Sequence, residues 1–225
     1  MKAYTYNDIF LYSKIEEILT KEENKILYEY CTKFGEKYKN EIEDMSYFIL
    51  EQDLTKHGFE YCKNNYLIRQ NIDVKLSDEE HENFNAITKE IEIRLNSEDI
   101  TSHYPNIETD NYHWHFNLVI SSTIPLRPHT DNPIDLIEYG IKNNIPVSSG
   151  IYKGMIYIGD PNINYKDYGT RMYKSSEEDS EICEIEFIPG NACIFKPSTN
   201  TWHGTDFKNG LPNNRYCITM QYYKD

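Results

Sequence analysis

The chain has 225 residues, of which 14% are aromatic, and its formal net charge is −14. A chain of this length can bury a sizeable core as one domain, and its aromatic content is higher than disordered chains carry. The negative charge argues against binding to nucleic acid, which needs a surplus of Lys and Arg facing the phosphates. We therefore expect one folded domain over residues 1–225, with a solvated acidic surface and no nucleic-acid partner.

Cysteine usage and hydropathy indicate the compartment. The five cysteines are an odd number and show no CxxC pair or zinc-finger spacing, which favours reduced thiols. The first 17 residues lack the apolar core of a signal peptide, and no apolar run approaches the length of a membrane span. We expect a cytoplasmic protein without a membrane partner, and the sequence does not indicate an oligomeric state.

The first half of the chain carries two helical patterns. Thr20 with Glu23, and Ser77 with Glu80, each have the spacing of a capping box at the start of an amphipathic helix. Apolar residues at helical spacing predict the buried faces of these two helices: Ile26, Leu27, Tyr30, Cys31, Phe34 and Tyr38 in the first, and Phe84, Ile87, Ile91 and Leu95 in the second.

Strand patterns dominate after residue 110. Residues 45–52 and 66–76 look like added strands, and about eight short strand segments follow from residue 111, separated by turns rich in Gly, Pro and Asn. This order predicts a mainly β protein with N-terminal helices (α+β), in which a double-stranded β-helix, or jelly roll, is buttressed by α-helices. Residues 1–110 would form the helical buttress with extra strands, and residues 111–225 the jelly-roll core.

The segment RPHTDNP, residues 127–133, places a histidine and an aspartate two residues apart. Pro128 favours extended backbone, and side chains alternate between the faces of a strand. His129 and Asp131 would then share one face, which provides two ligands of a metal site or a buried ion pair.

Two later residues extend this pair. His203 follows a predicted strand, and Arg215 begins the apolar strand YCITMQYY after a turn. A guanidinium that points into a barrel is costly unless an anion meets it, so Arg215 needs a carboxylate from the protein or from a ligand.

His129-x-Asp131, then His203, then Arg215 resembles the signature of the Fe(II)/2-oxoglutarate-dependent oxygenase superfamily. The resemblance covers roughly residues 111–223. It implies a jelly roll in which these two histidines and the aspartate hold Fe(II). It also implies that Arg215 binds the distal carboxylate of the cosubstrate 2-oxoglutarate, and that O2 is consumed with release of succinate and CO2. Because the carboxylate ligand is retained, hydroxylation is the first expectation, with desaturation or ring closure as variants.

The resemblance leaves the second carboxylate anchor open. The family commonly places a hydroxyl two residues after the arginine, where this chain has Cys217, so Thr219 or Asn117 are the candidate substitutes. For substrate binding we consider the residues near the predicted site, although core packing or surface ion pairs explain them about as well: Arg127, Arg171, His115, Tyr157 and Trp202. The charge run at residues 174–181 reads as a solvated loop, with a lid as the minority interpretation.

We expect a small-molecule substrate such as an amino acid or a derivative. A peptidyl-residue hydroxylase of the same superfamily is the first alternative. The second is a cupin-like metal-binding protein that does not use 2-oxoglutarate, with His113 and His115 supplying the metal pair and leaving Arg215 without a role. A non-enzymatic jelly roll that retains a metal is also open.

Overall fold

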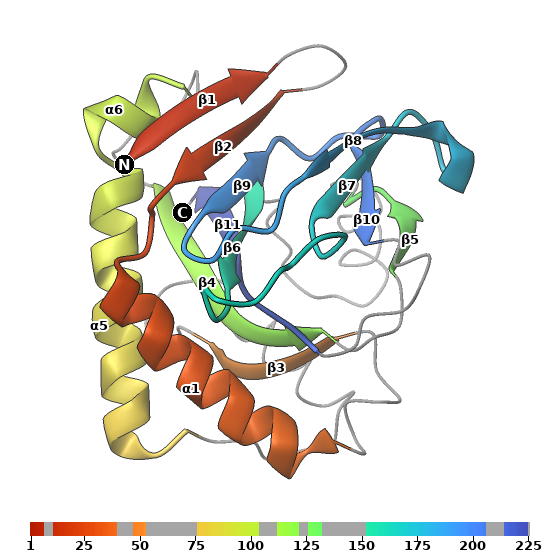
Figure 1. The fold of residues 1–225 in the computed structure, drawn as a ribbon. Helices are drawn as coiled ribbons and strands as arrows, with labels where there is room; N and C mark the ends of the chain where they lie inside the picture. The colour runs from red at the N-terminus through yellow and green to blue at the C-terminus, as the bar shows by residue number, and fades with distance from the viewer. Residues whose placement is uncertain are drawn as a thin grey trace, which may run out of the picture.

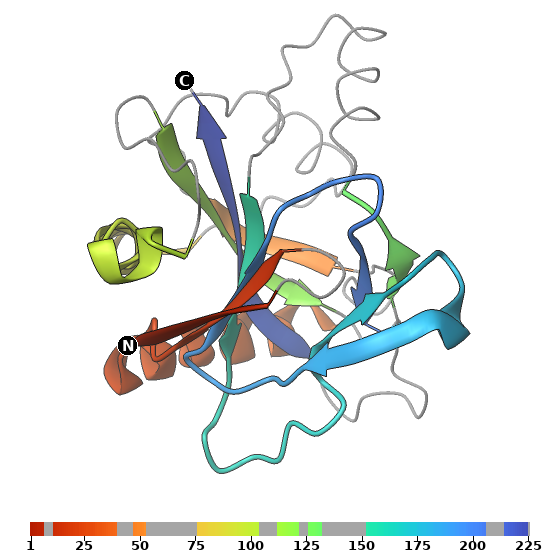
Figure 2. The same ribbon diagram turned by 90° about the horizontal axis from the view of Figure 1, so that it is seen from above.

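The computed structural model describes residues 1–6, 11–39, 47–52, 76–103, 112–121, 126–131, 152–205 and 214–224. Within these ranges the chain forms two antiparallel β-sheets, with helices along one side (Figure 1). Figure 2 shows the larger sheet between helix α5 (Asp78–Leu95) on one side and the smaller sheet on the other. Two facing antiparallel sheets are consistent with the predicted jelly roll.

The larger sheet has seven strands in the order β1-β2-β9-β6-β11-β4-β3, all antiparallel to their neighbours. These strands are β1 (Lys2–Tyr6), β2 (Tyr12–Glu16), β3 (Tyr47–Gln52), β4 (Tyr112–Ser121), β6 (Tyr152–Ile158), β9 (Ala192–Phe195) and β11 (Arg215–Lys224).

The smaller sheet has four strands in the order β5-β10-β7-β8, also antiparallel. They are β5 (Leu126–His129), β7 (Thr170–Tyr173), β8 (Glu181–Ile185) and β10 (Trp202–Thr205). A short 3-10 helix, Glu178–Ser180, precedes β8.

Alternation along the central strands separates two layers of side chains. Even-numbered residues of β4, β6 and β11, such as Phe116, Ile156 and Ile218, belong to one buried cluster with the helices. Odd-numbered residues such as Tyr157 point the other way and pack with residues of the smaller sheet, including Met172. The space between the sheets is therefore lined by odd-numbered residues of β4, β6 and β11.

Both predicted capping boxes are present. Helix α1 (Lys21–Lys37) begins after Thr20, whose hydroxyl accepts from the Glu23 backbone while the Glu23 carboxylate accepts from the Thr20 backbone. Ser77 and Glu80 make the same reciprocal pair at α5. The bidentate contact of Arg94 with Glu23, at 2.7 and 2.8 Å, then ties the two helices together. A third helix, α6 (Glu98–Thr101), follows α5.

The N-terminal hairpin of β1 and β2 was not predicted. Strand β2 pairs with β9, so the first residues of the chain add two strands to the larger sheet at the edge opposite β3. β3 confirms the strand predicted over residues 45–52, whereas the predicted strand over residues 66–76 lies almost wholly outside the described residues. No described helix is long and apolar enough to cross a bilayer.

Candidate metal centre

His129 and His203 are direct partners across the antiparallel pair of β5 and β10. Their ring centroids lie 4.4 Å apart, and the ring of Phe195 from the larger sheet lies 4.5 Å from that of His203. The ladder is irregular just after His203, where Gly204 meets β5. A Cβ at Gly204 would lie 2.5 Å from the Leu126 carbonyl oxygen, so glycine permits this close approach of the two strands.

The two imidazoles are held in the same tautomer. Nδ1 of His129 lies 2.9 Å from the Arg127 carbonyl oxygen, and Nδ1 of His203 lies 3.1 Å from the Thr201 carbonyl oxygen. A carbonyl oxygen only accepts, so each Nδ1 carries the proton and each Nε2 keeps its lone pair. This is the arrangement of metal-binding histidines, whose second nitrogen donates to a carbonyl or carboxylate.

Asp131 completes the group. One potential ligand atom from each of His129, Asp131 and His203 lies within 4.8 Å of the others, and the Asp131 Oδ2 is 3.5 Å from the His203 Nε2. Two neutral imidazoles and one carboxylate suit a divalent transition metal such as iron or zinc. Among the described residues, this is the group of three or more His, Cys, Asp or Glu side chains with the spacing to hold a metal ion.

Lys153 on β6 also faces the centre. Its Nζ is 3.4 Å from Oδ2 of Asp131, and only 9% of the residue is exposed. Burial alone would raise the pKa of Asp131, but Lys153 first, and then His203 and His129, hold that pKa well below its usual range. Burial and the neighbouring His203 lower the pKa of His129. The local charges therefore favour an ionised Asp131 carboxylate beside a neutral His129, as metal binding by these two groups requires.

Arg215 is buried between the two sheets, with 2% of its surface exposed. Its Nε donates to the Tyr168 carbonyl oxygen at 2.9 Å, and its Nη2 donates to the Thr170 hydroxyl at 3.0 Å. Among the described residues, its Nη1 reaches the Met155 sulfur alone, at 3.7 Å. Within the described part of the chain, no carboxylate forms an ion pair with this guanidinium.

Aromatic and hydroxyl groups surround the guanidinium. The Arg215 Cζ lies 5.4 Å from the ring centroid of Tyr157 and 5.9 Å from that of Phe187. The Tyr157 hydroxyl donates to the Thr170 hydroxyl oxygen at 2.9 Å, so Thr170 accepts from both Tyr157 and Arg215. Thr170, which the sequence analysis did not single out, is thus the hydroxyl that contacts the arginine.

The two substitutes considered for the second anchor lie on neighbouring strands. The Asn117 amide donates to the Thr219 hydroxyl at 3.3 Å across the paired strands β4 and β11. Thr219 has the same strand parity as Arg215 and Cys217, so all three side chains face the space between the sheets. A role for Asn117 or Thr219 in cosubstrate binding stays a prediction.

The residues predicted for substrate binding are spread over different surfaces. The Arg127 side chain is 88% exposed and lies 3.9 Å from Glu178. Arg171 makes ion pairs with two carboxylates of β8, Glu181 at 2.7 Å and Glu184 at 3.6 Å, which agrees with the ion-pair alternative. Trp202 precedes His203 in β10, so its side chain points to the opposite face of the strand.

The other two candidates lie on the larger sheet. His115 is buried on β4 and pairs with Gln221 of β11, while Tyr157 sits beside Arg215. His113 belongs to β4, but its side chain lies outside the described residues. His115 is not part of the group with metal-site spacing. Substrate contacts by these residues stay predictions.

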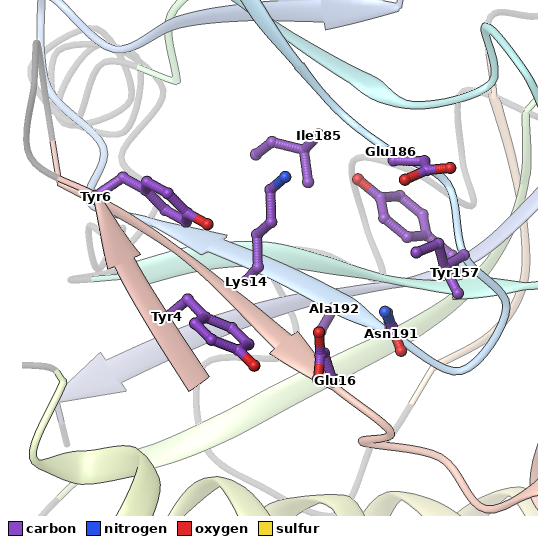
Figure 3. A pocket seen from close by; sticks show the side chains of 10 residues that line it. Tyr4, Tyr6, Lys14, Glu16, Tyr157, Ile185, Glu186, Asn191 and Ala192 are labelled. Carbon is purple, nitrogen blue, oxygen red and sulfur yellow. The ribbon is translucent and has the colours of Figure 1, made fainter. Parts of the chain in front are cut away.

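A pocket of about 230 Å³ opens at another place, between the β1–β2 hairpin and the segment that joins β8 to β9 (Figure 3). Tyr6, Lys14 and Glu186 point toward it from these elements, and Tyr157 contributes to its wall. None of the three residues of the metal centre lines it. Tyr157 therefore connects this pocket to the surroundings of Arg215 rather than to the metal centre.

Two residues that contact the candidate ligands or Arg215 were not recognised from the sequence. Lys153 lies on β6 four positions from Tyr157, and Thr170 lies on β7 next to Arg171, but neither belongs to a recognisable motif. The available signal for Lys153 was side-chain alternation along the strand, because Lys153, Met155 and Tyr157 point to the same face of β6.

No known family profile matches the sequence, and no curated protein matches it. Comparison with solved structures finds similarity to the crystal structure of a Pseudomonas putida prolyl-4-hydroxylase. The two chains are 13% identical, the TM-score is 0.50, and the match covers 95% of this chain and 92% of the other. At this identity the comparison shows the fold: the chain shares its overall architecture with that enzyme over almost its whole length.

Proposed function

We propose that this protein is an Fe(II)- and 2-oxoglutarate-dependent dioxygenase that hydroxylates a small molecule such as an amino acid or a derivative. The observation that carries the proposal is the combination, inside one barrel, of a pre-oriented His-Asp-His group with a buried arginine that has no carboxylate partner among the described residues. A metal site alone would leave Arg215 unexplained, and a buried unpaired cation is costly unless a ligand anion meets it.

The donor set fits Fe(II). Nε2 of His129 and of His203 would coordinate the metal together with the Asp131 carboxylate, and three ligands on one side leave positions open for other molecules. The carbonyl oxygens of Arg127 and Thr201 keep both rings in the ligating tautomer. When bound, iron with 2-oxoglutarate and O2 supplies the oxidising chemistry, with succinate and CO2 as coproducts.

Arg215 fits the distal carboxylate of 2-oxoglutarate. The Tyr168 carbonyl and the Thr170 hydroxyl fix Nε and Nη2, while Nη1 meets only the Met155 thioether within the described ranges. A guanidinium fixed on one side is suited to bind a carboxylate through its remaining donors. Burial strengthens that contact because water does not compete for the charges.

Anaerobic titration of 2-oxoglutarate into the Fe(II)-loaded protein tests the proposal. We expect a weak visible metal-to-ligand charge-transfer band that needs far more 2-oxoglutarate in Arg215→Ala. Lys174→Ala, which removes an exposed cation, is the matched control and keeps the wild-type titration. Absence of the band in folded, iron-loaded wild-type protein would contradict the proposal.

A peptidyl-residue hydroxylase is the second candidate, and the architecture shared with the Pseudomonas putida prolyl-4-hydroxylase favours it. The two candidates differ in what stimulates succinate release. A free amino acid or related metabolite would raise the rate for a small-molecule enzyme. A peptide pool whose free amino acids have no effect would identify the peptidyl enzyme.

The cupin-like alternative places the metal on His113 and His115. It predicts metal loss in His113→Ala and retention in His129→Ala, the reverse of what the dioxygenase predicts. Metal content after dialysis of the two variants separates these alternatives without any assay of turnover.

A further inference from the structure

Lys153 brings a positive charge to the metal centre. It occupies the same face of β6 as Met155 and Tyr157, is almost fully buried, and approaches the Asp131 carboxylate at 3.4 Å. Within the described part of the chain, Asp131 is the residue with which Lys153 forms an ion pair. The ammonium therefore lies next to the space in which the metal of the proposed function would sit.

The charge balance of the site then differs from that of a plain His-Asp-His group. A divalent ion on two neutral imidazoles and one carboxylate has a net charge of +1, and Lys153 raises the local sum to +2. Arg215 adds another positive charge between the sheets. At short range in a buried site, a lysine opposes a bare divalent cation and attracts an anion that coordinates it.

We infer that Lys153 makes this centre bind its metal most favourably together with an anionic chelating ligand, rather than as the bare ion. The inference deepens the proposed function, because it rests on metal binding by His129, Asp131 and His203. It assigns Lys153 a role distinct from that of Arg215: Lys153 acts on the end of the ligand that coordinates the metal, and Arg215 acts on the far end.

Oxalate and 2-oxoglutarate separate these roles. Oxalate is a dianion that coordinates a metal but carries no distal chain to extend toward Arg215, whereas 2-oxoglutarate carries a second carboxylate at its far end. Co(II) serves as the probe metal, because its visible bands report both metal binding to the apoprotein and anion binding to the loaded protein. Two dissociation constants are measured for each variant, for Co(II) alone and for the anion on Co(II)-loaded protein.

We expect Lys153→Met to bind Co(II) as tightly as wild type or up to about tenfold tighter, because a repulsive charge is removed. The same variant should bind both oxalate and 2-oxoglutarate at least about tenfold more weakly, and Lys153→Arg should restore most of this affinity. Arg215→Met is the matched control: it should weaken 2-oxoglutarate and leave oxalate unchanged.

Two results would overturn the inference. Unchanged oxalate affinity in Lys153→Met would show that the ammonium does not act on a coordinated anion. A large loss of Co(II) affinity in that variant would show that Lys153 merely holds Asp131 in place. Failure of the proposed function looks different, because wild-type protein would then bind Co(II) and oxalate but not 2-oxoglutarate. Wild-type protein that binds no Co(II) would overturn both proposals.

Discussion

Gly204 allows His203 to face His129. The two histidines are cross-strand partners. Because Gly204, the next residue, has no side chain, the Leu126 carbonyl oxygen can lie 2.5 Å from the position that a Cβ of residue 204 would occupy. A real Cβ would clash there with rigid backbone. The separation of β5 and β10, and hence of the two imidazoles, therefore depends on this glycine.

We predict that Gly204→Ala forces β5 away from β10 and weakens both folding and metal binding. The loss of stability should be about 1–3 kcal/mol, the usual cost of inserting a methyl group into packed structure. Urea unfolding and Co(II) titration measure the two effects. Gly35→Ala in α1 is the control, because its new methyl group would meet mainly the movable end of the Tyr216 side chain. Wild-type metal affinity in Gly204→Ala would contradict the prediction.

Removal of either imidazole should abolish tight metal binding. Loss of a residue that merely supports a ligand typically costs 10–100-fold in metal affinity, so His129→Ala and His203→Ala should lose at least about 100-fold. His81→Ala, on helix α5, should bind metal like wild type. Isothermal titration with Co(II) makes the comparison, and equal losses in all three variants would point to a general folding defect.

Thr170 should affect cosubstrate binding through Arg215. Thr170→Val keeps the shape of the side chain but removes the oxygen that accepts from Arg215 and Tyr157. Without this contact the guanidinium is held less firmly in its orientation. We therefore expect the KM for 2-oxoglutarate to rise about tenfold, which corresponds to the free energy of about one hydrogen bond to a charged group. The kcat at saturating 2-oxoglutarate should change little.

Thr88→Val provides the control for Thr170→Val. Thr88 is also buried, but it lies in α5 and donates to the Asn85 carbonyl oxygen. Both variants should lose similar stability, and only Thr170→Val should change the KM. A fall in kcat without a change in KM would show that Thr170 does not act on the cosubstrate.

The link between the helices should make stability depend on pH. Burial alone would raise the pKa of Glu23, but the hydrogen bonds from Arg94 and Thr20 outweigh it, so this pKa lies below the ordinary value of about 4.3. A lowered carboxyl pKa stabilises the fold above the unfolded value, and that stabilisation is lost as the pH falls through the folded pKa.

Glu23→Gln tests this dependence, because glutamine can keep the capping box while it removes the charge. We expect the variant to be about 1–2 kcal/mol less stable than wild type at pH 7 and to approach wild type as the pH falls through the folded pKa of Glu23. Glu82→Gln, on an exposed position of α5, should show no such convergence. Urea unfolding at several pH values gives the comparison.

Local signals in the sequence were sufficient for helices α1 and α5 and for the candidate pair His129 and Asp131. The reciprocal pairs of Thr20 with Glu23 and Ser77 with Glu80 depend only on spacing along the chain, so they could be predicted. The proximity of His129 and Asp131 was expected from their spacing of two residues, although β5 ends at His129 and Asp131 lies just beyond it. Their meeting with His203 depended on the resemblance to a family, because the pairing of β5 with β10 is a long-range contact.

The features that could not be predicted from the sequence depend on how distant strands pair in the fold. Lys153 looked like an ordinary strand lysine, and only the position of β6 within the larger sheet directs it toward Asp131. The β1–β2 hairpin was missed because its stabilising partner, β9, lies at the other end of the chain. Long-range pairing of this kind leaves little trace in local composition.

The two candidate histidine ligands lie on a different sheet from Lys153 and Arg215. His129 and His203 lie on the smaller sheet, whereas Lys153 and Arg215 project from the larger one. A molecule that coordinates the metal and also reaches Arg215 would act as a non-covalent cross-link between the sheets. Its binding should therefore slow amide hydrogen exchange in β5 and β10 as well as in β6 and β11. Exchange rates in both sheets would then show whether the centre is occupied.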